Sequence, residues 1–173
     1  QFARRAATPS VKMIEVKLSQ GAKPGHGGIV PAAKLTPELV EIRGVVPAKD
    51  VVSPAAHTAF STPLGLLQFL QRLREASGGK PVGFKLCIGH PWEWFAICKA
   101  MLHTGIVPDF IVVDGAEGGT GAAPLEFTDH VGAPLQEGLL LVHNTLVGLG
   151  LRQRVKLGCA GKVIGAFDIA RAM

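Results

Sequence analysis

Short apolar runs alternate along this chain with longer segments of helical periodicity. The runs expected to form strands are Met13–Leu18, Asp50–Ser53, Val82–Leu86, Phe110–Asp114 and Arg154–Leu157. The segments expected to form helices are Thr36–Arg43, Pro63–Ser77, Pro91–Thr104, Leu135–Leu149 and Gly165–Met173. This order is typical of βα units around a parallel sheet. The sequence therefore predicts an α/β protein of about five βα units.

Periodicity alone does not distinguish an open doubly wound sheet from a barrel, but both place ligands at the carboxyl ends of the strands. A complete (β/α)8 barrel needs about 250 residues, whereas this chain has 173. If the fold is a barrel, we expect residues 1–173 to form a single partial domain, cut short at its C-terminus. Its unpaired strand edges would favour association between copies, or completion by strands from outside this sequence.

Composition narrows the classes of partner. The chain is 47% hydrophobic and 18% charged, which excludes a disordered protein. The formal net charge is +5, but the basic residues are scattered and tyrosine is absent. The chain therefore has few aromatic side chains on which bases could stack, and we expect no nucleic-acid partner. A basic balance is compatible instead with small acidic ligands.

The cysteines and the apolar segments indicate a cytoplasmic protein. Cys87, Cys98 and Cys159 form neither a C-x-x-C pair nor an even set, so no disulfide framework is expected. No His/Glu spacing predicts a metal site. The N-terminus has no apolar core of a secretory signal. The apolar stretch Gly138–Leu151 is too short to cross a bilayer.

The loop after the Phe110–Asp114 run is the clearest candidate for a binding site. It reads DGAEGGTGAAP, and its candidate ligand-contacting residues are Asp114, Gly115, Gly118, Gly119, Thr120 and Gly121. Without a Cβ, glycine lets a backbone approach a ligand closely, and successive N–H groups bind anions. A flexible connection is the alternative interpretation. The loop lacks the Gly-Lys-Ser/Thr ending of a P-loop and the helix of a dinucleotide motif.

Three lysines are candidates for contacting an anion. Lys17 and Lys23 bracket a glycine-rich turn within KLSQGAKPGHGG, where two ammonium groups would hold a carboxylate or a phosphate. They could also be ordinary loop lysines. Lys85 interrupts an apolar strand, where a buried ammonium is costly without a partner. It either faces solvent or lies beside the N1/O2 edge of a reduced flavin.

These segments together resemble the FMN-binding barrel of glutamate synthase and of the smaller FMN-binding glutamate synthase family proteins. The matching stretches are IEVKLSQGAKPGHGG, VVSPAAH, VGFKL, VVDGAEGGTGAAPLEF, GLLLVHNTLVGLGL and GKVIGAFD. Their order and spacing match as well, and they extend over nearly the whole chain. The resemblance implies a (β/α)8 barrel, of which this chain would be part.

The same resemblance implies the chemistry. In the family, the barrel carries FMN and an iron–sulfur cluster, and 2-oxoglutarate binds in front of the flavin ring. The oxo acid condenses with ammonia, and the imine is reduced to glutamate. Lys17 and Lys23 match the lysines that contact the oxo acid, and Lys85 matches the catalytic lysine beside the flavin. The glycine loop Gly115–Gly121 matches the loop that runs close to the cofactor.

Several positions depart from the family's pattern. His26 and Ile29 stand where the synthase has Glu and Gln, so another oxo acid or imine is an alternative substrate. Ala160, Gly161 and Lys162 replace D-G-Q, which leaves Gly161 and Lys162 as candidate flavin contacts by position. The cluster cysteines have no counterpart in this chain, and no electron donor is indicated. A catalytically silent fragment is the third alternative.

Overall fold

The computed structural model describes residues 1–119 and 123–173. At its centre is a parallel sheet of four strands, in the order β1-β4-β5-β6. The strands are β1 (Ile14–Lys17), β4 (Val82–Leu86), β5 (Phe110–Asp114) and β6 (Lys156–Ala160). Helices α3 (Pro63–Ala76), α4 (Pro91–Thr104) and α5 (Leu135–Gly148) connect these strands. The alternation confirms the α/β class and matches part of a (β/α)8 barrel.

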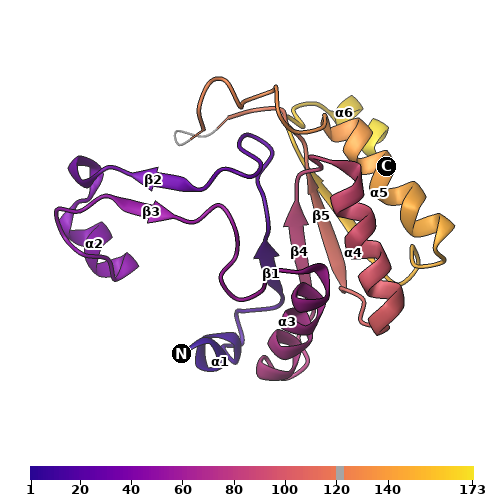
Figure 1. Cartoon of the computed structure of the whole chain (residues 1–173), viewed down its shortest axis with the longest axis horizontal. Coiled ribbons are helices and arrows are strands. Elements are labelled where there is room, and N and C mark those ends of the chain that lie inside the picture. The colour runs from indigo at the N-terminus through magenta and orange to yellow at the C-terminus, as the bar shows by residue number, and fades with distance from the viewer. Residues whose placement is uncertain (120–122) are drawn as a thin grey trace.

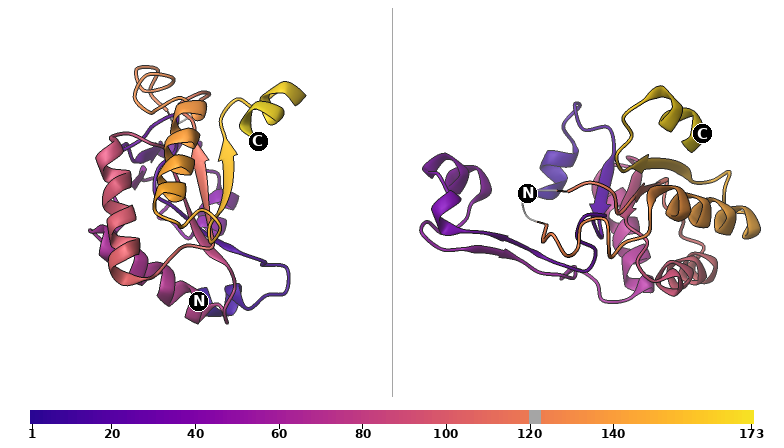
Figure 2. Two further views of the ribbon diagram at one scale, coloured as in Figure 1. Left: turned by 90° about the vertical axis from the view of Figure 1, so that its right-hand side faces the viewer. Right: turned by 90° about the horizontal axis from the view of Figure 1, so that it is seen from above.

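The two faces of the sheet have different surroundings. Helices α3, α4 and α5 lie along one side of the strands (Figures 1 and 2). Phe84, Ile111 and Val113 point to that side and are fully buried among helix side chains such as Trp94. Burying each such side chain contributes roughly 1.5–3 kcal/mol. These helices do not cover the other face. The inner wall of a (β/α)8 barrel is likewise free of helices, because the helices lie outside the strands.

The segment Asp50–Ser53 does form a strand, but not in the parallel sheet where it was expected. Strand β3 (Val51–Ser53) pairs antiparallel with β2 (Gly28–Val30), which the sequence did not reveal. Together with the 3-10 helix η1 (Ala32–Lys34) and helix α2 (Pro37–Arg43), they form an arm that extends away from the sheet (Figure 1). Val52 is 68% exposed, whereas a strand of a parallel sheet is buried on both faces. The arm is therefore an insertion between β1 and α3.

Most element boundaries follow signals in the sequence. The hydroxyl oxygens of Thr36 and Thr62 accept backbone N–H bonds at the starts of α2 and α3. Strand β6 begins two residues later than expected and ends three later, at Ala160. The short helix α1 (Phe2–Ala6) was not predicted.

The last helix, α6 (Ala166–Ala172), has no buried residue. Phe167 within this helix is 91% exposed, and Ile164 just before it is 86% exposed. Figure 2 shows α6 standing apart from α5. Within residues 1–119 and 123–173, no helix is long and apolar enough to cross a membrane.

Candidate active site

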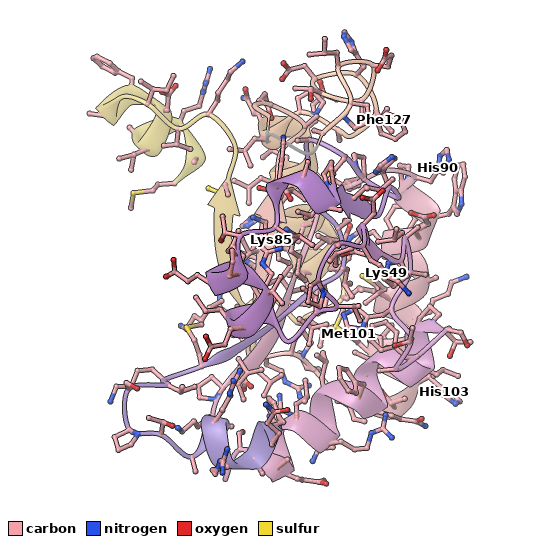
Figure 3. All side chains as sticks on the ribbon, turned by 90° about the vertical axis from the view of Figure 1, so that its left-hand side faces the viewer. Lys49, Lys85, His90, Met101, His103 and Phe127 are labelled. Atoms are coloured by element: carbon pink, nitrogen blue, oxygen red, sulfur yellow. The ribbon has the colours of Figure 1, made fainter. Side chains whose placement is uncertain are left out.

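The residues expected to carry function gather at the carboxyl edge of the sheet. Lys17 ends β1, Lys85 lies near the end of β4, and Asp114 ends β5. Parallel strands bring these ends to one edge. In the register of the sheet Lys17 pairs with Lys85, and Lys85 pairs with Val112. Paired positions point to the same face, so both lysines lie on the face without helices; Figure 3 shows Lys85 from that side.

Asp114 is the buried centre of this edge. It is 8% exposed, and its Oδ1 lies 3.3 Å from Nζ of Lys85. Its Oδ2 accepts a hydrogen bond of 2.8 Å from the backbone N–H of Gly21. The strand lysine is therefore paired with a carboxylate on the neighbouring strand, and does not face solvent alone. The alternative of an unpaired surface lysine does not describe Lys85.

Three glycines at this edge pack against one another. A Cβ on Gly21 would overlap the carbonyl oxygen of Gly115. A Cβ on Gly161 would lie 3.2 Å from both N and Cα of Gly115. Gly161 also has φ +145°, a conformation that favours glycine. Close contact between the loops that follow β1, β5 and β6 thus explains these glycines, and their contact with a cofactor stays a prediction.

Glu117 has a role that the sequence did not reveal. Both of its carboxylate oxygens lie 2.9 Å from the backbone N of Leu135, the first residue of α5. Helix α5 follows Pro134 and has no capping side chain of its own. A helix that starts without Ser, Thr, Asp or Asn at its N-cap needs an acceptor for its first N–H groups from elsewhere in the chain. Pro134 at this position was the sequence signal that such an acceptor was needed. A carboxylate there also interacts favourably with the helix dipole.

The middle of the glycine loop is described in part. Gly118 has φ +94°, and its N–H donates to Oδ1 of Asp129 at 3.1 Å. Among the described residues, no atom lies within 4 Å of a Cβ built on Gly118. The nearest side-chain atom that a Cβ on Gly119 would meet belongs to Thr128, at 3.6 Å. The predicted contacts Thr120 and Gly121 lie outside the described residues.

Lys162, in the loop after β6, contacts the loop after β5. Its Nζ lies 3.9 Å from Oδ2 of Asp129, the residue that accepts from Gly118. Both side chains are about half exposed, so this pair contributes little to stability. The pair is a contact between the loop after β6 and the loop after β5. A contact between Lys162 and a flavin stays a prediction.

Lys17 ends β1 and Lys23 lies in the connection from β1 to β2, and both bind neutral oxygens. Nζ of Lys17 donates to Oε1 of Gln20 at 2.9 Å, and Nζ of Lys23 donates to the carbonyl of Gly27 at 3.0 Å. Neither is paired with a carboxylate among the ion pairs of residues 1–119 and 123–173. Because charged partners form stronger hydrogen bonds than neutral ones, both ammonium groups have capacity for an anion.

Two of the positions that depart from the family's pattern, His26 and Ile29, follow Lys23 in the chain. The ring of His26 packs edge-on against Phe127, with ring centroids 5.3 Å apart. This contact joins the loop after β1 to the loop after β5, near the top of Figure 3. Ile29 lies in the arm and is 55% exposed. The structure thus gives His26 a packing contact, whereas Ile29 is more than half exposed.

Cys87 lies directly behind this edge and is held as a thiol. Burial, together with the carboxylates of Asp114 and Glu117, raises its pKa from 9.0 to about 11. Its Sγ occupies the space that a Cβ on Gly132 would need. A thiol that is this weakly acidic is a poor nucleophile at neutral pH.

Two cavities lie near the site. The smaller, about 220 Å³, is lined by the ends of β1 and β4 and the start of α4, including Ser19, Cys87 and Trp94. The larger, about 780 Å³, lies mainly on the helix side, between α5, β6 and α6, and one end reaches Glu117 and Lys162. Lys17, Lys23 and Lys85 line neither of these two cavities. The candidate site is therefore defined by the Lys85–Asp114 ion pair and by the register of β1 and β4, and not by the volume of a cavity.

No three His, Cys, Asp or Glu side chains within the described ranges lie close enough together to hold a metal ion. The three cysteines are free, with Cys87 and Cys98 buried and Cys159 half-buried.

Comparison with known proteins identifies the family. The family described as "Conserved region in glutamate synthase" matches residues 5–173. The glutamate synthase large subunit-like protein YerD of Bacillus subtilis is 42% identical over 173 residues, all of this chain and 33% of that protein. The archaeal glutamate synthase (NADPH) of Methanocaldococcus jannaschii is 36% identical over 161 residues, 92% of this chain and 31% of that protein.

A longer relative matches as well. The ferredoxin-dependent glutamate synthase of Antithamnion sp. is 35% identical over 160 residues, which are 92% of this chain and 10% of that protein. The chain therefore spans a third or less of the length of these relatives. The matched region contains the strand ends that carry Lys17, Lys85 and Asp114. The chain belongs to the glutamate synthase family.

Proposed function

We propose that this chain forms the flavin- and substrate-binding wall of an FMN-dependent oxidoreductase that makes glutamate from 2-oxoglutarate and ammonia. One observation supports it above the others: the Lys85–Asp114 pair lies beside Lys17 on the open face of the sheet. Three relatives are named as glutamate synthases or as similar to their large subunit, which agrees with the reaction. The electron donor is left open, since those names include both NADPH and ferredoxin.

The described residues fit FMN. Helices α3, α4 and α5 do not cover the face of the sheet that carries Lys17 and Lys85 (Figure 1), and no described atom lies within 4 Å of a Cβ built on Gly118. Lys85 supplies a positive charge on that face, where it would stabilise the negative charge of a reduced flavin. When bound, FMN would supply hydride transfer. The iron–sulfur cluster does not fit the described residues, because they contain no group of three potential ligands.

Lys17 and Lys23 would hold the carboxylates of the oxo acid. In the structure their ammonium groups bind an amide oxygen and a backbone carbonyl. Exchanging these neutral partners for a carboxylate gives a charge-assisted bond, roughly twice as strong. The hydrogen bond from Gly21 to Asp114 holds the loop that carries Lys23 against β5. The backbone two residues before Lys23 is therefore anchored to the sheet.

A second candidate keeps the family and changes the substrate. His26 packs on Phe127, and Ile29 offers no hydrogen bond to a carbonyl or carboxylate. The site as described thus has fewer polar contacts than the family's pattern provides. We propose a different oxo acid or imine as the alternative substrate.

Turnover separates the two candidates. The flavin of the whole protein is reduced chemically, and its reoxidation is followed after adding ammonia with 2-oxoglutarate or with each of a panel of other oxo acids. Glutamate formed from 2-oxoglutarate, measured by mass spectrometry, supports the first. Reoxidation by another oxo acid but not by 2-oxoglutarate supports the second, and a flavin that none of them reoxidises contradicts both.

A further inference from the structure

Asp114 contacts two of the segments on which the proposed site depends. Its Oδ1 pairs with Lys85 on β4 at 3.3 Å, and its Oδ2 accepts from Gly21 in the loop after β1 at 2.8 Å. The residue is 8% exposed, so both interactions are shielded from water. Burial makes such a charge-assisted contact stronger than the same contact at the surface. One side chain on β5 thus links β4 and the loop after β1.

The pair also resolves a conflict of charge. Lys17 and Lys85 are direct neighbours in the register of β1 and β4, and like charges at such positions destabilise a sheet. The side chain of Lys85 is 22% exposed, and a mostly buried ammonium needs a partner. Among the ion pairs of the described residues, Asp114 supplies the one carboxylate next to any of the three site lysines.

The bond to Gly21 fixes a loop and not just an atom. Gly21 lies between Lys17 and Lys23 in the chain, and it packs so closely on Gly115 that a Cβ would not fit. The backbone N of Lys23 donates to the carbonyl of Gln20, which continues the turn. Fixing Gly21 therefore fixes the turn from which Lys23 extends.

We infer that Asp114 is a positioning residue: it holds Lys85 directly, and the Lys23 loop through Gly21, in one arrangement. In this role it acts through these groups, and a contact between Asp114 and a cofactor stays a prediction. The meaning of that arrangement for catalysis rests on the proposed function. The anchoring itself does not, and it is measurable without any ligand.

The test compares Asp114→Asn and Asp114→Ala with a matched control, Asp109→Asn. Asp109 directly precedes the first residue of β5, at the end of the strand opposite Asp114, and makes the same kinds of contact. It pairs with Arg74 at 2.9 Å and accepts from the backbone N of Val82 at 2.8 Å. Amide hydrogen exchange is measured by NMR or mass spectrometry on the protein without ligand. Circular dichroism and the melting temperature identify variants that do not fold.

Asp114→Ala is expected to raise exchange at Gly21 by about 10- to 100-fold, the range for losing a hydrogen bond to a charged group. Asp114→Asn keeps the shape and a neutral acceptor, so a smaller increase is expected. Asp109→Asn should raise exchange at Val82 and leave residues 19–28 unchanged. Wild-type exchange at Gly21 in a folded Asp114→Asn variant and in a folded Asp114→Ala variant would overturn the inference, as would equal loosening of residues 19–28 by Asp109→Asn.

A second readout reports on charge. With FMN bound, Asp114→Asn is expected to shift the flavin midpoint potential to more positive values, because the charge of Lys85 is no longer neutralised. Lys85→Met should shift it to more negative values, and Asp109→Asn should leave it unchanged. Equal potentials in wild type and Asp114→Asn would refute the link to Lys85. If wild-type protein takes up no FMN, the proposed function fails, and exchange at Gly21 still decides the inference.

Discussion

At the scale of single residues, the site depends on glycines as much as on charges. Gly21, Gly115 and Gly161 bring three loops into contact at the carboxyl edge of the sheet. The lysines extend from this junction or lie beside it, so their positions depend on backbone packing that no other residue type allows.

Replacing Gly21 by alanine should therefore loosen the junction. The added Cβ would overlap the carbonyl oxygen of Gly115, and the backbone must move to accept it. We expect a loss of roughly 1–3 kcal/mol in the free energy of unfolding, as for other overpacked sites, measured by urea denaturation. Gly148→Ala is the control: a Cβ there meets nothing within 4 Å at the end of α5. Equal effects of the two substitutions would contradict the packing explanation.

The buried thiols predict how stability changes in alkaline solution. Burial raises the pKa of Cys98 from 9.0 to about 12. Below pH 9 the thiol is protonated in both states, whereas above it the unfolded chain ionises first, so folding stability falls as the pH rises toward 12. The limiting slope is about 1.4 kcal/mol per pH unit for one thiol.

Comparison with Cys98→Ala isolates this effect, because every other ionising group is shared. Urea denaturation from pH 8 to 10.5 should give a steeper decline for wild type than for the variant. Parallel declines would show that Cys98 ionises equally in both states.

At the scale of elements, the body and the arm differ in how well they are supported. Strands β4 and β5 lie in the middle of the sheet and are buried under α3, α4 and α5. The arm consists of β2, η1, α2 and β3, and neither α2 nor η1 has a buried residue. An isolated pair of short strands is marginally stable in water.

Amide exchange should therefore be fast throughout the arm and slow in the sheet. We expect residues 28–53 to exchange at least about 100-fold faster than β4 and β5, since local opening of the arm costs far less than global unfolding. Exchange of the arm as slow as that of β5 would show that another surface covers it.

The elements also show how far sequence reasoning reaches. The start of α3 followed from Thr62 ahead of Pro63, and α4 has the predicted bounds, Pro91–Thr104. Val51–Ser53 was placed in the wrong sheet, because a three-residue apolar run looks the same in a buried strand and in an exposed hairpin.

The site was predictable in kind but not in detail. Lys85 and Asp114 were each identified from their places on strands, whereas their pairing depends on the register of β4 and β5. Local sequence does not set that register, because the two strands are joined by a whole helix. The packing of Gly21 on Gly115 is likewise a contact between distant segments.

At the scale of the whole molecule, the sheet has one face under helices and one face open. The open face carries Lys17 and Lys85, and strand β6 forms one edge. An uncovered face and an unpaired edge are the features that a barrel removes by closing. Association between copies, or completion by further strands, stays a prediction that light scattering of the protein tests: a clean monomer of this chain would exclude self-association.

The proposed function requires this face to bind FMN beside Lys85. Its most direct test is a titration of the protein with FMN, followed by flavin fluorescence and visible absorbance, with Lys85→Met and Asp109→Asn in parallel. We expect saturable binding by wild type and by Asp109→Asn, and binding at least about tenfold weaker with Lys85→Met, as for the loss of one charge-assisted contact. Protein that shows no flavin spectrum after saturation with FMN, or that binds it equally well without the Lys85 ammonium, would contradict the account.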